Sequence, residues 1–397
     1  MKKVVVLGAV RTPIAAIGKS LAALTARELA SFAIGKAIEA AGVKPEQIQY
    51  TTMGWVMQDP RSPNLAKVAG EFAGIPNHVP GTTFHENCAS GGAAVHSLAR
   101  RIILGEVEIG VAGGVESMSN VARYLYAGRT SAQLYGEMTL EDGVMGALLD
   151  RNIGPKGELM GLTTEKVVEK YNVTREEQDE VAFRSHKNAL ATWDAGLFAD
   201  YVVPVPVPQR KGDPIIFAKD EGPRVVTMEQ LAAAKPYFKR DGGTITGPNS
   251  SSINDGAAAL VLASEEMAAE LGIKPLAELI SWHNVGVPRE LMGEGAFKVI
   301  PGLLKRAGIT MGDIDFFELN EAFAAVVAAA FHDLPELDVG KTNQWGSGIS
   351  LGHPVGCTGA RQIVDMVQQL RRRNKTIGLT SRCVGGGMGS GEIVKVI

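Results

Sequence analysis

The chain of 397 residues is longer than one ordinary hydrophobic core supports, so we expect two related domains or one domain with a large insertion. A net charge of −3 without a basic stripe argues against nucleic acid as a partner, and no apolar run reaches the roughly 18–20 residues that cross a bilayer membrane. Three cysteines, an odd number, argue against a disulfide framework and favour thiol chemistry in a reducing compartment such as the cytoplasm.

Residues 1–119 alternate between predicted strands and helices. The clearest helix begins after the capping-box pattern Thr25-Ala26-Arg27-Glu28, continues to about Ala41 and ends at Gly42. The other predicted elements of this part are strands at residues 3–8, 51–56 and 108–112 and a helix at residues 64–73. This alternation is typical of an α/β architecture with helix-covered sheets.

A cysteine lies where a short predicted strand turns into a helix of small residues. The stretch runs from Gly81 to about Leu104, with a tight turn at Cys88. The unpaired N–H groups and the positive end of a helix stabilise a thiolate there, so the pKa of Cys88 should fall below about 8.5. A small buried cysteine with a purely structural role is the alternative interpretation of this segment.

Residues 120–248 have a different character, because aromatic, proline and charged residues are scattered through them and strand patterns are few. One helix is clear: a capping box begins at Thr174, and the helix runs from Gln178 to about Ala195 with Gly196 as its stop. We interpret this segment as an inserted loop domain over one face of the core, where substrate-binding regions usually lie.

The core resumes at about residues 249–270, and a second half follows at residues 271–397. The second half contains two glycine-rich clusters, each with a reactive side chain. One is residues 352–359, which contain His353, and the other begins at Cys383. Glycine beside a reactive group usually means that the backbone approaches a ligand closely or that N–H groups point at it.

The segment after His353 resembles the segment after Cys88. In both, a reactive residue precedes a small-residue helix, a strand and a glycine-rich loop, and the second copy places the helix at residues 360–373 and the strand at 376–380. We therefore predict that the two halves are diverged copies of one strand–helix module.

Four further residues carry chemical expectations. His353 is the natural base, because a histidine followed by proline in a glycine loop is poorly explained by packing. Cys383 precedes three glycines, which fits either a second acid/base or an oxyanion cradle. Asn320 follows a predicted strand and opens a helix, so an N-cap is its default interpretation. We interpret Cys357 as structural, and zinc is not expected because no ligand pair has CxxC or HxxxH spacing.

Six motifs, in order along essentially the whole chain, closely resemble those of the thiolase family. They are Asn87-Cys88-Ala89-Ser90-Gly91, Gly113-Gly114-Val115-Glu116-Ser117-Met118-Ser119, Asn254-Asp255-Gly256-Ala257, Asn320-Glu321-Ala322-Phe323, Gly352-His353-Pro354-Val355-Gly356 and Cys383-Val384-Gly385-Gly386-Gly387-Met388-Gly389. The resemblance implies the thiolase fold: two similar halves with helix-covered mixed β-sheets in five layers (α-β-α-β-α), plus the inserted loop domain.

The resemblance also implies a reaction and residue roles. The family cleaves 3-ketoacyl-CoA with CoA to acyl-CoA and acetyl-CoA, or condenses acyl-CoA molecules in reverse, as an acetyl-CoA C-acetyltransferase or C-acyltransferase. Cys88 would be the acylated nucleophile, His353 its activator, and Cys383 the acid/base at the acetyl-CoA methyl carbon and the CoA thiol. One oxyanion hole would comprise His353 and a water held by Asn320, and the other the backbone N–H groups of Cys88 and Gly385.

The binding partners implied by the resemblance are acyl-CoA and CoA, with CoA as a substrate and no permanently bound cofactor. The protein would act as a homodimer or homotetramer, a dimer of dimers. Ser251 best matches the serine that contacts the pantetheine arm, and Met160 and Phe323 are expected in the substrate pocket. The candidates for contacts with the CoA phosphates, among which the sequence does not choose, are Arg210, Lys211 and Arg224.

The chain departs from the family pattern near the expected acyl pocket. Leu159-Met160-Gly161 stands where synthetic members commonly carry His-Met-Gly, so a substrate-lining histidine is missing. Trp345-Gly346-Ser347 replaces an Asn-Gly-Gly that often precedes the histidine loop. These changes leave the chemistry intact and leave open the acyl chain length and the direction used in the cell.

Two other functions fit the scaffold less well. A decarboxylating ketoacyl synthase shares the fold but expects two catalytic histidines, and Cys383 stands where the second would be needed. A non-catalytic acyl-CoA or lipid-binding protein would be expected to lose Cys88, His353 or Cys383, and all three are present.

Overall fold

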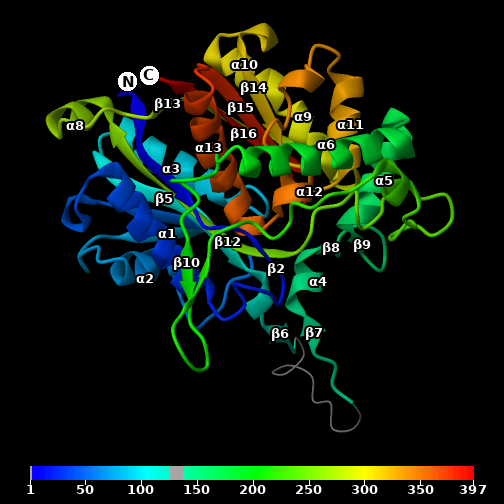
Figure 1. Cartoon of the computed structure of the whole chain (residues 1–397), viewed down its shortest axis with the longest axis horizontal. Helices are drawn as coiled ribbons and strands as arrows, with labels where there is room; N and C mark the ends of the chain where they lie inside the picture. The colour runs from blue at the N-terminus through cyan, green and yellow to red at the C-terminus, as the bar shows by residue number, and fades with distance from the viewer. Residues whose placement is uncertain (1, 126–136) are drawn as a thin grey trace.

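The computed structural model describes residues 2–125 and 137–397, and a ten-stranded mixed sheet runs through it (Figure 1). The strand order is β14-β15-β16-β13-β1-β12-β5-β3-β4, with β2 beside β12. The N-terminal half contributes β1 (Val4–Arg11), β2 (Ala15–Ala16), β3 (Thr51–Gly54), β4 (Gly81–Phe84), β5 (Ile109–Ser117) and β12 (Asn254–Ser264). The C-terminal half contributes β13 (Ala277–Gly286), β14 (Phe316–Leu319), β15 (Ile377–Val384) and β16 (Met388–Val396).

The two halves meet in the sheet where β1 pairs with β13, through Val5 opposite Glu278 and Val6 opposite Ala277. On either side of this junction the order repeats, because β1-β12-β5-β3 corresponds to β13-β16-β15-β14. The last pair of each series is parallel, and the others are antiparallel. This repeated order agrees with the prediction of two similar halves.

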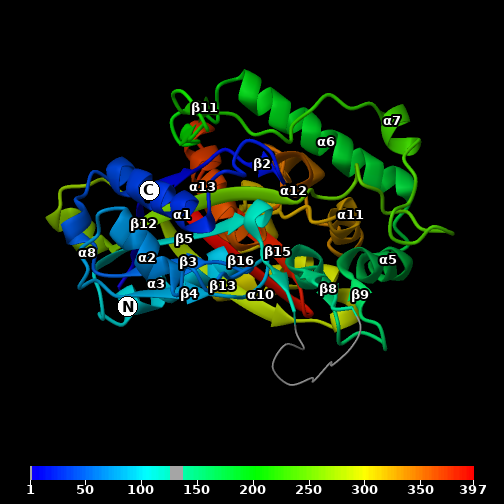
Figure 2. The same cartoon turned by 90° about the horizontal axis from the view of Figure 1, so that it is seen from below.

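Helices cover both faces of the strands in three layers (Figures 1 and 2). The central pair, α3 (Ser90–Ile103) and α13 (Val355–Arg372), packs between the halves, and α13 contacts β5 and β12 on one side and β15 and β16 on the other. The outer helices are α1 (Ala26–Ala41) and α2 (Leu65–Phe72) on the N-terminal strands and α9 (Gly295–Lys298) and α10 (Ile300–Ala307) on the C-terminal strands. The predicted five-layer α/β fold is confirmed.

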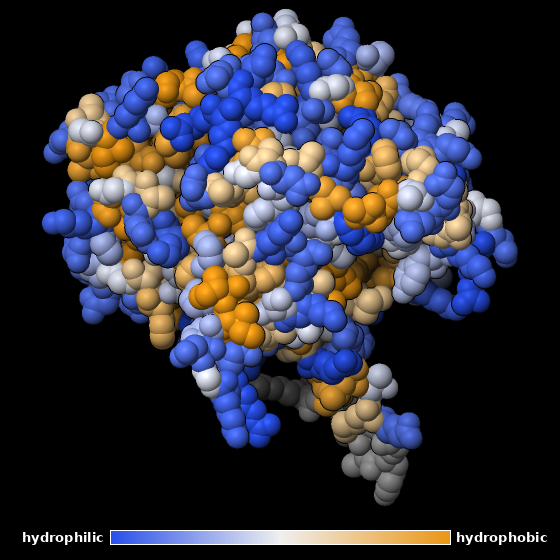
Figure 3. Space-filling model, viewed as in Figure 1, coloured by the Kyte–Doolittle hydropathy of each residue, from blue (hydrophilic) through white to orange (hydrophobic). Residues whose placement is uncertain are grey.

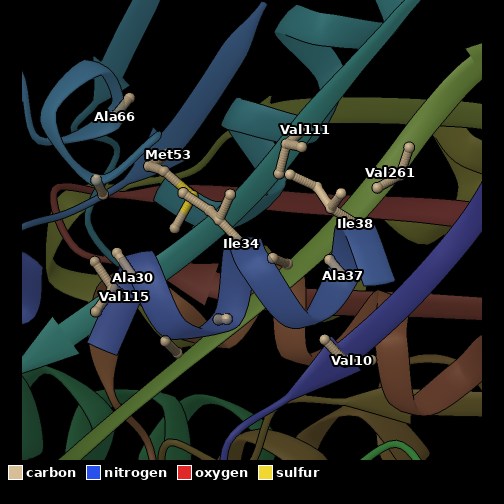
Figure 4. Close-up of a cluster of buried hydrophobic side chains, with 14 of the residues drawn as sticks. Val10, Ala30, Ile34, Ala37, Ile38, Met53, Ala66, Val111, Val115 and Val261 are labelled. Atoms are coloured by element: carbon tan, nitrogen blue, oxygen red, sulfur yellow. The ribbon is translucent and has the colours of Figure 1, made fainter. Parts of the chain in front are cut away.

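Helix α1 shows how an outer layer follows from local sequence. The Thr25 hydroxyl accepts the backbone N–H of Glu28, whose carboxylate accepts the backbone N–H of Thr25, and Gly42 ends the helix with φ of 68°, as predicted. Ile34 and Ile38, one turn apart, are buried in one cluster with Met53 of the sheet (Figure 4). Full burial of one such side chain contributes about 1.5–3 kcal/mol.

Helix α13 begins at Val355, earlier than predicted, so residues 356–359 form its first turn rather than a loop. The reason is the approach of α3 to α13. A Cβ on Gly91 of α3 would lie 2.8 Å from the backbone nitrogen of Ala360, so glycine is required where the two helices touch. Considered alone, the glycines of residues 356–359 indicate a turn. In the folded chain they lie in α13, where they allow α3 to cross at close range.

The insertion covers parts of both halves of the core (Figure 1). Its longest helix, α6 (Arg175–Asp194), follows the predicted capping box at Thr174 and packs against α11 (Ala324–Asp333) of the second half. Val205 and Val207 are buried with α1 of the first half. A buried ion pair of 2.9 Å between Arg11 of β1 and Asp220 ties the insertion to the core. Its other elements are β6 (Arg123–Tyr124), β7 (Glu141–Asp142), α4 (Gly143–Ala147), β8 (Leu149–Asp150), β9 (Glu158–Leu159), α5 (Met160–Tyr171), β10 (Val205–Val207), β11 (Ile215–Phe217) and α7 (Met228–Ala232).

Polar and charged residues cover much of the face shown in Figure 3, with apolar patches between them. In the ranges that the structure describes, every helix is too short or too polar to cross a membrane. The remaining helices are α8 (Glu265–Glu270), α11 (Ala324–Asp333) and α12 (Gly348–Leu351), and short 3-10 turns lie at Pro45–Gln47, Met118–Asn120, Arg289–Glu294, Met311–Asp313 and Val339–Lys341.

Candidate active site

The turn between β4 and α3 holds Cys88 beside a cavity. Asn87 adopts the left-handed conformation with φ of 46°. The Ser90 hydroxyl fixes the turn, because it accepts the backbone N–H of Glu86 at 2.8 Å and donates to the carbonyl of Asn87 at 2.7 Å. Cys88 is half-buried and lines the cavity. The tight turn predicted at Cys88 is therefore present.

His353 lies within hydrogen-bonding distance of Cys88. Its Nε2 is 3.3 Å from Sγ of Cys88, and its Nδ1 is 2.6 Å from Oγ1 of Thr358. The Thr358 hydroxyl donates its proton to the carbonyl of Pro354 at 3.0 Å, so towards His353 it acts as an acceptor and Nδ1 carries the ring proton. Nε2 is then the acceptor that faces the Cys88 thiol.

Burial controls the titration of both partners. It lowers the pKa of His353 to about 3, with the charge of Arg361 as a second cause. It raises the pKa of Cys88 to about 11, although the backbone N–H groups of Gly385 and Cys88 act in the lowering direction. The expected low pKa of Cys88 is therefore wrong, because desolvation of the thiolate outweighs those donors. At neutral pH the pair is a thiol and a neutral imidazole, and the thiolate forms as the proton moves to Nε2.

A second thiol and a pair of N–H donors complete the centre. The backbone N–H groups of Gly385 and Cys88 act on Sγ of Cys88 in the direction that lowers its pKa. Cys383, at the end of β15, is buried and lines the same cavity. Burial and the neighbouring Cys88 raise the pKa of Cys383, so its thiol holds its proton at neutral pH. The fold thus brings two thiols, a neutral imidazole and two backbone N–H groups to one place.

Asn320 is buried after β14, and it is not the N-cap that its sequence position suggests. The next helix, α11, has Phe323 as its N-cap. The backbone N–H of Asn320 donates to the carbonyl of Ser381 at 2.8 Å, while Oδ1 and Nδ2 have no partner among the described residues. Oδ1 is 2.9 Å from the position of a Cβ on Gly348, in the helix that precedes the His353 loop. This amide is therefore available to bond a ligand near that loop.

Two buried side chains hold the His353 loop in place. Oδ1 of Asn254 accepts the backbone N–H of His353 at 2.9 Å. Glu116 accepts the backbone N–H of Gly356 at 2.9 Å and that of Met57 at 3.1 Å. Because Met57 belongs to the first half and Gly356 to the second, Glu116 links the start of α13 to the first half of the chain.

Two adjoining cavities lie at the site, and the inner one reaches Cys88. The inner one, of about 70 Å³, contains all three reactive side chains, and the outer one is about 280 Å³. Of the residues assigned to substrate from the sequence, Met160, Ser251 and Phe323 line both cavities and Leu159 lines the outer one. Their largely apolar walls fit an acyl chain. Within the described ranges, no group of three or more His, Cys, Asp and Glu side chains is placed to hold a metal ion.

Part of this wall and the partner of His353 were not among the residues predicted from the sequence. Phe238 lines the outer cavity and packs edge-on against Phe323 at 5.9 Å between ring centres. Gly161 makes room for it, because a Cβ there would lie 2.3 Å from the Phe238 ring. The only local signal for this wall is the pair of adjacent aromatic residues Tyr237 and Phe238. Thr358 gave no signal of its own, because it lies in a segment that was predicted to be a turn.

Thr358→Val should lower kcat by roughly 10–100-fold, by analogy with the loss of a group that orients a metal-binding histidine. Valine keeps the shape but cannot accept the Nδ1 proton, so the imidazole is no longer fixed with Nε2 as the acceptor. Thr358→Ser keeps the hydroxyl and should retain most activity. Steady-state turnover of both variants provides the measurement, and equal rates for valine and wild type would contradict this role.

Comparison with known proteins matches both halves of the chain to one family. Models of the thiolase N-terminal and C-terminal domains match residues 4–266 and 273–396. An acetyl-CoA acetyltransferase of Cupriavidus necator is 41% identical over 390 residues, 98% of this chain and 98% of that protein. A probable acetyl-CoA acyltransferase of Staphylococcus epidermidis is 40% identical over 395 residues, 99% of each chain.

Solved structures show the same similarity in three dimensions. The acetyl-CoA acetyltransferase of Bacillus anthracis superposes with a TM-score of 0.96 at 41% identity, covering 100% of this chain and 99% of that one. Human mitochondrial 3-ketoacyl-CoA thiolase in complex with CoA gives a TM-score of 0.94 at 35% identity, covering 100% and 98%.

Proposed function

The chain belongs to the thiolase family and is an acyltransferase, and we propose that it cleaves 3-ketoacyl-CoA with CoA through an acyl-enzyme on Cys88. The observation that supports this best is the 3.3 Å approach of His353 Nε2 to Cys88 Sγ, in a cavity that the Cys383 thiol shares. The products are acetyl-CoA and an acyl-CoA shortened by two carbons. The reverse condensation uses the same groups.

In the first half-reaction Cys88 Sγ attacks the 3-keto carbon while His353 Nε2 takes the thiol proton. Charge develops on the former keto oxygen and is stabilised by fixed hydrogen-bond donors. The bond between carbons 2 and 3 then breaks, and its electron pair forms the enolate of acetyl-CoA. The Cys383 thiol protonates that carbon, which leaves an acyl thioester on Cys88 and a thiolate on Cys383.

In the second half-reaction the Cys383 thiolate takes the proton of the CoA thiol, and the CoA sulfur attacks the acyl group on Cys88. The backbone N–H groups of Gly385 and Cys88 are suited to stabilise the oxyanion, because both favour negative charge at the sulfur that carries the acyl group. Collapse releases acyl-CoA, and the proton held by His353 returns to Cys88. Asn320 and His353 are proposed to serve the oxygen of the acetyl-CoA enolate.

The direct test is thiolysis of a series of 3-ketoacyl-CoA substrates of increasing length. The reaction is measured as the decrease in the absorbance of the enolate form of the substrate. Consumption of substrate with stoichiometric formation of acetyl-CoA supports the proposal. A chain that decarboxylates a malonyl thioester without cleaving 3-ketoacyl-CoA would instead be a ketoacyl synthase. A chain that binds acyl-CoA and turns over neither substrate would be a binding protein.

Leu159 leads us to propose acceptance of acyl chains longer than acetoacetyl. The side chain is at the wall of the outer cavity, where the resemblance expects a histidine. A leucine cannot donate to a polar group and adds surface that gains about 0.8 kcal/mol for each buried methylene. We expect kcat/KM for 3-ketohexanoyl-CoA to equal or exceed that for acetoacetyl-CoA, and Leu159→His to shift the ratio towards acetoacetyl-CoA. A preference of more than about tenfold for acetoacetyl-CoA, or no effect of the substitution, would contradict this specificity.

Cys383→Ala should impair carbon–carbon bond formation more than acyl transfer to Cys88. Acyl transfer from a simple acyl-CoA to Cys88 forms no carbon–carbon bond and moves no methyl proton, so it should be impaired less than condensation. The measurements are isotope exchange between acetyl-CoA and CoA and the rate of acetoacetyl-CoA formation. Equal losses in the rates of exchange and condensation would show that Cys383 is not needed more for carbon–carbon bond formation than for acyl transfer.

We also propose a homodimer, or a homotetramer built as a dimer of dimers. Strand β4 is outermost in the sheet and pairs with β3 on one side, which leaves its other edge to face a second copy. Sedimentation velocity at micromolar concentration measures the mass, and a monomer would contradict the proposal. Three free cysteines support a reducing compartment such as the cytoplasm.

A further inference from the structure

Asn87, the residue before the nucleophile, bonds across the site to the glycine loop of the other half. Its Nδ2 donates to the carbonyl oxygen of Gly385 at 2.8 Å and so joins positions 298 residues apart. Cys88 follows Asn87 in its turn, and Gly385 lies two residues after Cys383. The bond therefore connects the two loops that supply the reacting thiols. Asn87 and Gly385 both line the inner cavity.

Gly385 has no side chain that could hold its own orientation. Gly386 and Gly387 follow it with φ of 91° and 85°, conformations that glycine adopts without steric cost. Val384 and Met388 pair across the ends of this loop, and hydrogen bonds from other segments hold the peptide groups between them. Val287 N–H supplies one to the carbonyl of Gly387 at 2.9 Å, and Asn87 supplies one to the carbonyl of Gly385.

The backbone and the side chain of Asn87 serve different purposes. Its φ of 46° lies in the left-handed region, which glycine, asparagine and aspartate adopt most readily. Glycine at this position would therefore allow the same turn but would have no amide to reach Gly385. A Cβ on Gly385 would lie 3.3 Å from Asn87 Nδ2, which shows that the amide packs closely against the loop. The two purposes can be separated by substitution.

We propose that Asn87 is a positioning residue for the thioester oxyanion, an inference that rests on the proposed thiolase activity. A donor stabilises an oxyanion best when it is held in position before the charge develops. Asn87 donates a hydrogen bond to the carbonyl of Gly385 and is covalently joined to Cys88, and the backbone N–H groups of these two residues favour negative charge at Sγ. Loss of the amide frees Gly385, so acylation of Cys88 slows while binding of the CoA ester is preserved.

The first test is Asn87→Gly, with acylation of Cys88 by acetyl-CoA followed in single turnovers by rapid quench and mass spectrometry. The rate should fall by roughly 10–100-fold, less than the 10²–10³ lost with a whole oxyanion donor, while KM stays within about threefold. The melting temperature should match wild type. Asn374→Gly is the control, because Asn374 has a similar φ of 51° and is exposed at the opposite end of α13 from His353.

Asn87→Asp supplies a readout that a purely structural role would not move. The carboxylate tolerates the same backbone conformation but presents an acceptor to the Gly385 carbonyl, so the variant should be at least as slow as Asn87→Gly near neutral pH. Partial burial and the facing carbonyl oxygen disfavour the carboxylate and raise its pKa above the usual value of about 3.9. The rate relative to wild type should therefore rise as pH falls from about 7.5 to about 5.5, because a protonated carboxyl can donate to that carbonyl. If this variant does not fold, the role of Asn87 is tested by Asn87→Gly alone, in which kcat should fall while KM stays nearly unchanged.

Acylation rates within about twofold of wild type in both variants would overturn the role of Asn87. It would also be overturned by losses that follow the melting temperature and show no recovery at low pH. A wild-type protein without thiolysis would overturn the proposed function itself, whereas an active wild type matched by both variants would overturn this inference alone.

Discussion

Replacement of Cys88 by alanine should abolish both thiolysis and condensation, with a loss of at least roughly 10³-fold, as in enzymes that lose the nucleophile of a catalytic set. The reason is that no other thiol can take over. Cys383 is buried at the end of β15 with a raised pKa, and Cys357 is buried inside α13. His353 Nε2 lies against Cys88, so only that sulfur has a base at hydrogen-bonding distance.

The same variant should fail to retain acyl label. Wild-type protein incubated with radioactive acetyl-CoA and then denatured should carry one acyl group per chain on Cys88. The matched control is Cys357→Ala, which removes a buried thiol from the core and should keep both label and turnover. Turnover of Cys88→Ala within tenfold of wild type, or label that persists on it, would overturn the nucleophile assignment.

The reactive residues could be predicted from the sequence because their signals are local. Cys88 stands at a strand-to-helix turn and His353 and Cys383 stand among glycines, and such patterns reflect constraints within a few residues. The capping boxes at Thr25 and Thr174 are local in the same way, and both are present. Repetition of the module also indicated two similar halves.

The failures concern properties that arise only on packing. The pKa of Cys88 depends on burial that the two halves create together, which the sequence near Cys88 does not encode. The glycines at residues 356–359 belong to a helix, because α3 approaches there from the other half. Phe238 comes from an aperiodic part of the insertion, and its contact with Phe323 exists only in the folded chain.

Replacement of His353 by alanine should lower kcat by roughly 10²–10⁴, the usual range for a positioned general base. The pKa values of about 3 for His353 and about 11 for Cys88 mean that the thiol keeps its proton at neutral pH unless Nε2 accepts it. Alanine leaves solvent as the only acceptor. His78→Ala is the matched control, because it removes an exposed histidine that lines neither cavity of the site and should not change turnover.

The pH dependence of alkylation by iodoacetamide distinguishes a base from an oxyanion donor. In wild type His353 is a neutral acceptor above its pKa of about 3, so proton transfer to Nε2 adds a route that does not depend on pH, and the rate at Cys88 should depend on pH less steeply than in the variant. In His353→Ala the rate should follow the free thiolate, which increases about tenfold for each pH unit below the pKa of Cys88. The variant should therefore react more slowly at pH 7 and approach wild type only in strongly alkaline solution. An unchanged rate and pH profile would mean that His353 serves the oxyanion alone, and that Cys88 loses its proton by another route.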